Sequence, residues 1–279
     1  MLKNITTGLK RALRCWKWIL VYWLISALSV SMILVSFKTS VRKIIGSSLI
    51  TERLAAGFPA DVIVNSGTGL DSVLSSIVPG AFLVLLVTLL TNAFFTGGLF
   101  SAVRSGSDTD ARNFFGSAAY FFRKFLGIYL LTFTVLFILA LLLVAVPSAI
   151  GYNYIGDKIL YISFAVYFAA SVLVIAAADF SRAIIIEEGN PGFFKAVGSG
   201  IKSFSAAFIN NYSAIILILI IQVLFACMFV LFIARPLNFQ GKGLMIIAAG
   251  HIFFIIKVFL RCWRYGTVTS ITESQSPGI

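Results

Sequence analysis

Long apolar runs, separated by short polar segments, form the main pattern of this 279-residue chain. A helix rises about 1.5 Å per residue, so about 20 apolar residues cross the roughly 30 Å hydrocarbon core of a bilayer. The pattern predicts an all-α fold: a polytopic membrane helix bundle that forms one integral membrane domain over residues 1–279. Its six predicted transmembrane helices lie near 18–37, 79–103, 125–146, 160–182, 212–234 and 243–263.

Prolines and polar residues at the ends of these runs indicate where the helices begin and end. Pro79 is expected in a first helical turn, where its missing N–H has no partner to lose. Pro147 is expected to end the third helix, because an interior proline removes a backbone hydrogen bond. The first run follows a basic segment but is too long for a signal peptide and lacks a small-residue cleavage site, so an uncleaved first span is expected.

The composition excludes a soluble globular domain. Hydrophobic residues make up 59% of the chain and charged residues 11%, whereas charged residues are about a quarter of an average soluble domain. The net charge is +12, and 15 of the 22 Lys and Arg residues fall in the termini and in the loops on their side of the bundle. Since basic residues favour the cytoplasmic side, both termini should be cytoplasmic, with a long outer loop at 38–78.

The two longer inner loops resemble each other. In both, a Phe-Ser pair at the end of one span is followed by a Phe-Phe pair and then by basic residues with a phenylalanine, at an offset of 79 or 80 residues. This predicts that spans two and three, with their loop, are repeated in the same sense as spans four and five. The matching segments are 100–104, 113–115 and 123–125 in the first copy, and 180–182, 192–194 and 202–204 in the second.

Each of these inner loops is also predicted to form an amphipathic helix on the cytoplasmic surface, with Asp108 or Asp110 capping the first and Asn190 the second. Apolar residues recur at spacings of 3 and 4, which places them on one helix face. Basic residues accompany them, a composition suited to an anionic inner leaflet. The helices either pack as a floor across the spans or sense lipids or a partner. Their aromatic and basic residues are Phe114, Phe121, Arg123, Lys124, Phe194, Ile201, Lys202 and Phe204.

Polar residues inside predicted spans are candidates for function. Asn92, Gln222 and His251 each fall near the middle of a span, so they are candidates for one polar cluster. Such a cluster would either line a proton or solute path or hold helices together by hydrogen bonds.

Asp179 and Arg182 form a second candidate set near the cytoplasmic end of the fourth span. They are three residues apart and therefore share a helix face. An ion pair is the expected way to accommodate an acid at this depth. The pair would either fix the end of the span or make a gating or docking contact.

The residues needed for metal or nucleotide chemistry are scarce. Cys15, Cys227 and Cys262 have neither the spacing of a zinc site nor a CxxC pair, and His251 is the single histidine of the chain. There is no phosphate-binding GxxxxGK[ST] loop. We therefore expect no cofactor, no metal and no nucleic-acid partner.

The order of a first span, a long outer loop, a span ending in FFTGGLF (94–100), an aromatic-basic inner helix and a span containing ADFSRAIII (178–186) resembles a bacterial family of six-span membrane proteins. That family is similar in layout to the membrane domain attached to glycerophosphodiester phosphodiesterases. The resemblance implies a bacterial plasma membrane location and no particular activity, and we expect no soluble phosphodiesterase domain within these 279 residues.

Three functions are compatible with these patterns. A non-enzymatic membrane scaffold or membrane-organising component is the main hypothesis, with the anionic inner leaflet, other membrane proteins or further copies of this chain as partners. A transporter or permease subunit using the polar spans is the alternative, and an intramembrane enzyme is the third. A water-accessible path would favour the transporter, and two facing acids or a serine beside His251 would favour the enzyme.

Overall fold

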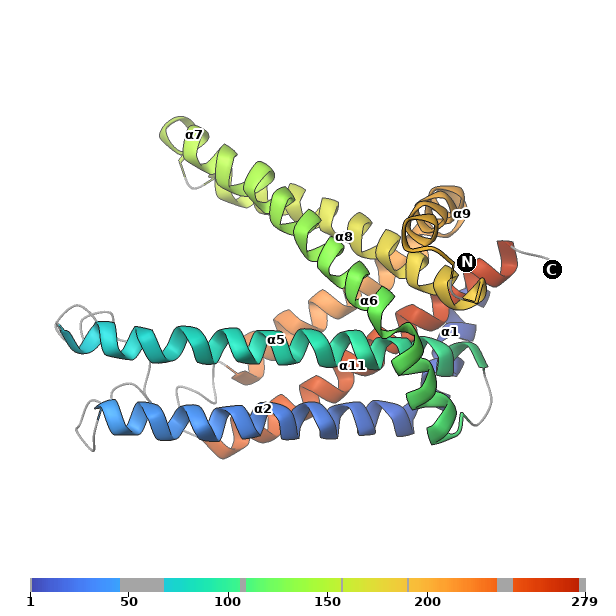
Figure 1. The fold of residues 1–279 in the computed structure, drawn as a ribbon. Helices are drawn as coiled ribbons and strands as arrows, with labels where there is room; N and C mark the ends of the chain where they lie inside the picture. The colour runs from blue at the N-terminus through green and yellow to red at the C-terminus, as the bar shows by residue number, and fades with distance from the viewer. Residues whose placement is uncertain are drawn as a thin grey trace. The chain divides into compact units, whose positions relative to one another are not determined.

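The structure is a computed structural model, and it describes residues 2–45, 68–105, 109–156, 158–189, 191–234 and 243–275. All regular elements within these ranges are helices (Figure 1), which confirms the predicted all-α class. In chain order they are α1 (Leu2–Arg14), α2 (Trp16–Ile45), α5 (Thr68–Ser105), α6 (Ala111–Ala140), η1 (Leu141–Ala145), α7 (Val146–Ile155), α8 (Lys158–Glu187), α9 (Phe193–Met228), η2 (Phe229–Ala234) and α11 (Gly243–Gln275).

Five helical segments are long and apolar enough to cross a membrane, so the chain fits a multi-pass membrane protein. A further candidate is the pair Leu2–Arg14 and Trp16–Ser31, which is bent by 61° and makes a sixth span only if the two parts are taken together. The five segments are Val78–Ser105, Ala111–Gly151, Lys158–Glu187, Ser213–Ile233 and Met245–Gln275.

The two predicted inner-surface helices are not separate elements. The first is the beginning of α6 and the second is the beginning of α9, and each continues directly into the following span. With 36 residues, α9 is about 54 Å long, well over the thickness of a bilayer core. Asp110 caps α6 by accepting a hydrogen bond from the Ala111 N–H, whereas Asp108 and Asn190 lie outside the described residues.

Both prolines that were expected at helix ends lie inside helical segments. Pro79 follows more than two turns of α5, which begins at Thr68. Pro147 follows η1, a π-helical turn in which the Val146 N–H bonds the Leu141 carbonyl, five residues back. The wider π turn accommodates the missing proline N–H, so the chain stays helical to Ile155. Pro147 does not end the third span.

The chain folds as two compact units. Unit 1 comprises Met1–Lys17, Ala93–Gln222 and Phe259–Ile279, and unit 2 comprises Trp18–Asn92 and Val223–Val258. The core of unit 1 is rich in aromatic side chains, and its largest fully buried members are Tyr265, Phe100, Phe114, Phe125 and Phe180.

Equivalent residues of the two sequence repeats make equivalent contacts within unit 1. The Phe100 and Phe125 rings are 5.9 Å apart, and the rings of Phe180 and Phe204 are 5.8 Å apart. In each repeat, the end of one span therefore packs through a phenylalanine on the start of the helix that follows. The repeated motifs encode this aromatic contact.

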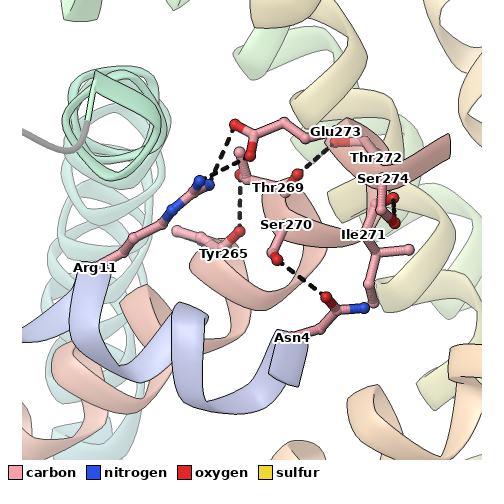
Figure 2. A network of polar contacts seen from close by, with 9 residues as sticks. All are labelled: Asn4, Arg11, Tyr265, Thr269, Ser270, Ile271, Thr272, Glu273 and Ser274. Atoms are coloured by element: carbon pink, nitrogen blue, oxygen red, sulfur yellow. Dashed lines mark hydrogen bonds and ion pairs between the residues drawn. The ribbon is translucent and has the colours of Figure 1, made fainter. Parts of the chain in front are cut away.

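Helix α1 packs on the end of α11, also within unit 1, at a crossing of small residues. A Cβ on Gly8 would lie 2.6 Å from the Thr267 backbone nitrogen, so only glycine fits there. Polar contacts surround the crossing (Figure 2): Arg11 donates to both carboxylate oxygens of Glu273, at 3.2 and 2.7 Å, and Ser270 donates to Asn4 at 3.1 Å. The amphipathic α1 thus has specific partners on α11.

Candidate functional site: a buried charge cluster

Asp179 and Arg182 form a buried ion pair near the end of α8. Nη1 of Arg182 donates to Oδ1 of Asp179 at 2.6 Å, and the two residues are 3% and 0% exposed respectively. That contact is the one expected from the three-residue spacing, because side chains at i and i+3 lie on the same helix face. The pair therefore follows from local sequence alone.

A second arginine, Arg264 of α11, shares the same carboxylate. Its Nε lies 2.6 Å from Oδ2 of Asp179, and its side chain is 9% exposed. The contact is an ion pair rather than an aligned hydrogen bond, since neither atom has a hydrogen-bond partner within the described residues. No pattern in the sequence predicts this role for Arg264. The one indication in the local sequence is that an arginine directly follows the last apolar run.

Gln222 of α9 joins the cluster through Arg264. Nη1 of Arg264 donates to Oε1 of Gln222 at 3.1 Å. The amide oxygen of Gln222 therefore faces Arg264, and its amide nitrogen points away from that arginine. Gln222 thus connects α9 to the charged groups of α8 and α11. It was expected instead to group with Asn92 and His251.

Tyrosines form the apolar surroundings of the arginines. The Arg182 guanidinium lies 4.4 Å from the centre of the Tyr129 ring, within the range of a cation–π contact. The Tyr129 hydroxyl is 2.9 Å from Oγ1 of Thr96. Tyr265, next to Arg264 in the chain, stacks on Phe100 with ring centres 4.1 Å apart. Side chains from α5, α6, α8, α9 and α11 therefore form one connected set of contacts that includes the Asp179 carboxylate.

The cluster holds more positive than negative charge. Asp179 contributes one negative charge against the two positive charges of Arg182 and Arg264, which leaves a net charge of +1. Removing one partner from a buried ion pair typically costs about 3–5 kcal/mol. A guanidinium that is only partly neutralised in this setting is therefore unfavourable without a further acceptor.

The other two predicted polar residues have partners on α2, in unit 2. Oδ1 of Asn92 accepts a hydrogen bond from the Tyr22 hydroxyl. Nδ1 of His251 accepts from Nε1 of Trp23 at 3.3 Å. Asn92 and His251 therefore contact consecutive residues of α2, whereas Gln222 contacts Arg264 of α11.

An apolar cavity of about 270 Å³ also lies in unit 2, between the end of α9, η2 and α11. Phenylalanines form much of its wall, including Phe229 and Phe253, whose rings stack 4.3 Å apart. Such a lining is suited to hydrocarbon rather than to a polar solute.

The first predicted inner-surface helix has its aromatic residues where they were expected. Phe114 and Phe121 are buried in the protein together with Ala118. Arg123 is exposed, whereas Lys124 is half-buried and donates to the Pro191 carbonyl. This face of α6 packs against the protein, as the floor interpretation requires.

The second predicted helix buries a different face from the one that the floor interpretation requires. Phe204 is buried, but Phe194 is 86% exposed and Ile201 is 50% exposed, and Lys202 is exposed as well. The buried face instead carries Ala196 and Gly200, and a Cβ on Gly200 would lie 2.5 Å from the Cα of Ser181. At Gly200 the two backbones approach closely, so the small residues pack and Phe194 and Ile201 do not face the protein as the floor interpretation would require of them.

Among the described residues, no group of three or more His, Cys, Asp or Glu side chains is arranged to hold a metal ion. Cys15 and Cys262 are buried, whereas Cys227 is exposed. The chain matches no family model, no curated protein and no solved structure.

Proposed function

We propose that this chain is a non-enzymatic scaffold of the bacterial plasma membrane, with six spans and both termini in the cytoplasm. The excess of Lys and Arg in the termini and the loops on their side supports the orientation. Counting the bent pair of α1 and α2 as one span gives the even number that this orientation requires. The likeness in layout to the six-span bacterial family stays a prediction.

The observation that carries the scaffold proposal is the sharing of Asp179 between two helices. Both carboxylate oxygens face guanidinium nitrogens at 2.6 Å, one from α8 itself and one from α11. A carboxylate held in this way acts as a structural connection, because each of its oxygens already contacts a cation. Gln222 extends the connection to α9.

The start of α9 supplies a surface through which a scaffold can act. Phe194 and Ile201 are exposed, and Lys195 and Lys202 lie beside them in the sequence and are exposed as well. Exposed apolar side chains with interspersed lysines suit an anionic leaflet or the surface of another membrane protein. We therefore favour lipid or partner contact at α9, in contrast to the buried face of α6.

The test is purification of the tagged chain from its native membrane, with bound proteins and lipids identified by mass spectrometry. We expect Phe194→Ser to lose bound lipids or proteins that the unchanged chain retains. Phe133→Ser, which alters another exposed phenylalanine, is the matched control and should retain them. A sample that binds the same lipids and proteins as an unrelated tagged membrane protein would contradict the scaffold proposal.

A transporter is the second candidate, and the polar pairs of unit 2 favour it. Tyr22 and Trp23 are consecutive on α2 and contact Asn92 and His251, which lie in apolar spans. In proteoliposomes a transporter would show solute or ion flux that Asn92→Leu reduces. Thr134→Val, which removes an exposed hydroxyl from α6, should leave the flux unchanged. Absence of flux from the unchanged protein rejects this candidate.

A further inference from the structure

The buried charge cluster has a surplus of hydrogen-bond donors as well as a surplus of positive charge. Nε of Arg182 and Nε2 of Gln222 are both buried and have no hydrogen-bond partner among the described residues. The Arg182 side chain is 4% exposed, so bulk water satisfies few of its hydrogen-bond donors. Within the described part of the chain, Oδ2 of Asp179 is the unbonded acceptor of the cluster, and it already faces Nε of Arg264. What the cluster lacks is an acceptor that carries negative charge.

The described acidic residues of the same unit do not supply that charge. Glu273 pairs with Arg11, Glu188 pairs with Lys195, and Asp110 caps α6. Glu187 forms no ion pair with an arginine of the cluster within the described ranges. Arg261 lies three residues before Arg264 and thus on the same side of α11, which adds a further positive charge to the region.

We propose that the cluster binds one phosphate-type anion, which accepts from Arg182 and Gln222 and balances the second arginine. Guanidinium groups match the geometry of phosphate oxygens and bind them with charge-assisted hydrogen bonds. Arg182 lies five residues before the end of α8, about 8 Å along the helix, a depth that a lipid phosphate reaches. The anion is the phosphate of a lipid headgroup or a free phosphate. This site goes beyond the scaffold function and does not depend on it.

The first experiment is a titration of the full chain in a nonionic detergent, after phospholipid has been removed to the limit detected by mass spectrometry. The thermal midpoint is followed with potassium phosphate and, separately, with short-chain phosphatidylglycerol. Potassium chloride of equal ionic strength and short-chain phosphatidylcholine are the controls. A ligand that binds only the folded chain raises the midpoint progressively with its concentration.

Each result of this titration decides the proposal or the source of the anion. A rise with both ligands beyond their controls establishes the phosphate chemistry. A rise with phosphatidylglycerol alone identifies a lipid headgroup, and a rise with potassium phosphate alone identifies free phosphate. If neither ligand exceeds its control, the proposal is overturned without recourse to any variant.

The second experiment supplies the missing charge from the protein itself. Gln222→Glu places a carboxylate beside Arg264 without changing the size of the side chain. We expect it to raise the thermal midpoint of the ligand-free chain and to abolish the response to phosphate. Gln275→Glu adds the same charge at an exposed position of α11 and should do neither. If Gln222→Glu responds to phosphate as the unchanged chain does, the anion does not bind at this cluster.

Discussion

Asp179 and Arg264 come from helices that are separated in the sequence by the whole of α9, yet Oδ2 of the first lies 2.6 Å from Nε of the second. This contact turns a local pair on one helix into a connection between helices. Asp179 then holds two guanidinium groups, and among the described residues each of these arginines has this carboxylate as its one acidic partner. The stability of the cluster should therefore depend most on Asp179.

Asp179→Asn should reduce the free energy of unfolding more than Arg182→Gln or Arg264→Gln. It leaves two buried guanidinium groups without their carboxylate, and breaking one buried pair costs about 3–5 kcal/mol. The measurement is thermal melting of the purified variants in detergent. The double change of Asp179 and Arg264 should be milder than the sum of the two single changes.

The exposed pair of Lys195 and Glu188 is the control for that series. Its atoms are 3.3 Å apart, and the two side chains are 71% and 38% exposed. Exposed pairs contribute at most about 1 kcal/mol, so Glu188→Gln should hardly change the melting temperature. Strict additivity of the Asp179 and Arg264 effects would show that the two residues do not interact.

Gly200→Ala should destabilise the protein, whereas Gly198→Ala on the same helix should not. The added methyl at Gly200 would lie 2.6 Å from the Ser181 backbone nitrogen, so α8 and α9 would have to separate. At Gly198 the added methyl would meet no atom of a neighbouring segment within 4 Å, and alanine gains about 1 kcal/mol of helix propensity over glycine. Melting temperatures that move in opposite directions would support this packing; a loss at Gly198 would contradict it.

Phe204→Ala should cost about 3–5 kcal/mol, the usual range for a buried phenylalanine, because Phe204 is 9% exposed and packs on Phe180. Phe194→Ala should have little effect on folding, since its ring is 86% exposed. Denaturation of both variants in the same detergent provides the comparison. Equal losses would show that Phe194 packs against the protein after all.

Reporter fusions test the proposed orientation. A reporter joined after residue 60, in the long outer loop, and one joined at the C-terminus should lie on opposite sides of the membrane. The C-terminal fusion should have the activity of a cytoplasmic reporter, because basic residues favour that side. If both fusions give the same answer, either the six spans or the assignment of the loop is wrong.

The helical class and the approximate position of most spans could be read from the sequence, because a bilayer core offers no water to unpaired backbone groups and long apolar runs become helices there. The Asp179–Arg182 pair and the Asp110 cap were equally accessible, since each depends on residues within one helical turn. The buried face of Phe114 and Phe121 also follows from helical spacing, because apolar residues recur there at spacings of 3 and 4.

The tertiary structure decided the features that depend on a second helix. Arg264 and Gln222 join Asp179 only because α8, α9 and α11 converge, and no periodicity of one segment contains that information. At the start of α9 the sequence pattern favours the face with Phe194, but the fold buries the face with Gly200. Close approach of two backbones at a glycine determines which face packs, and this fit between two surfaces exists only once both helices are in place.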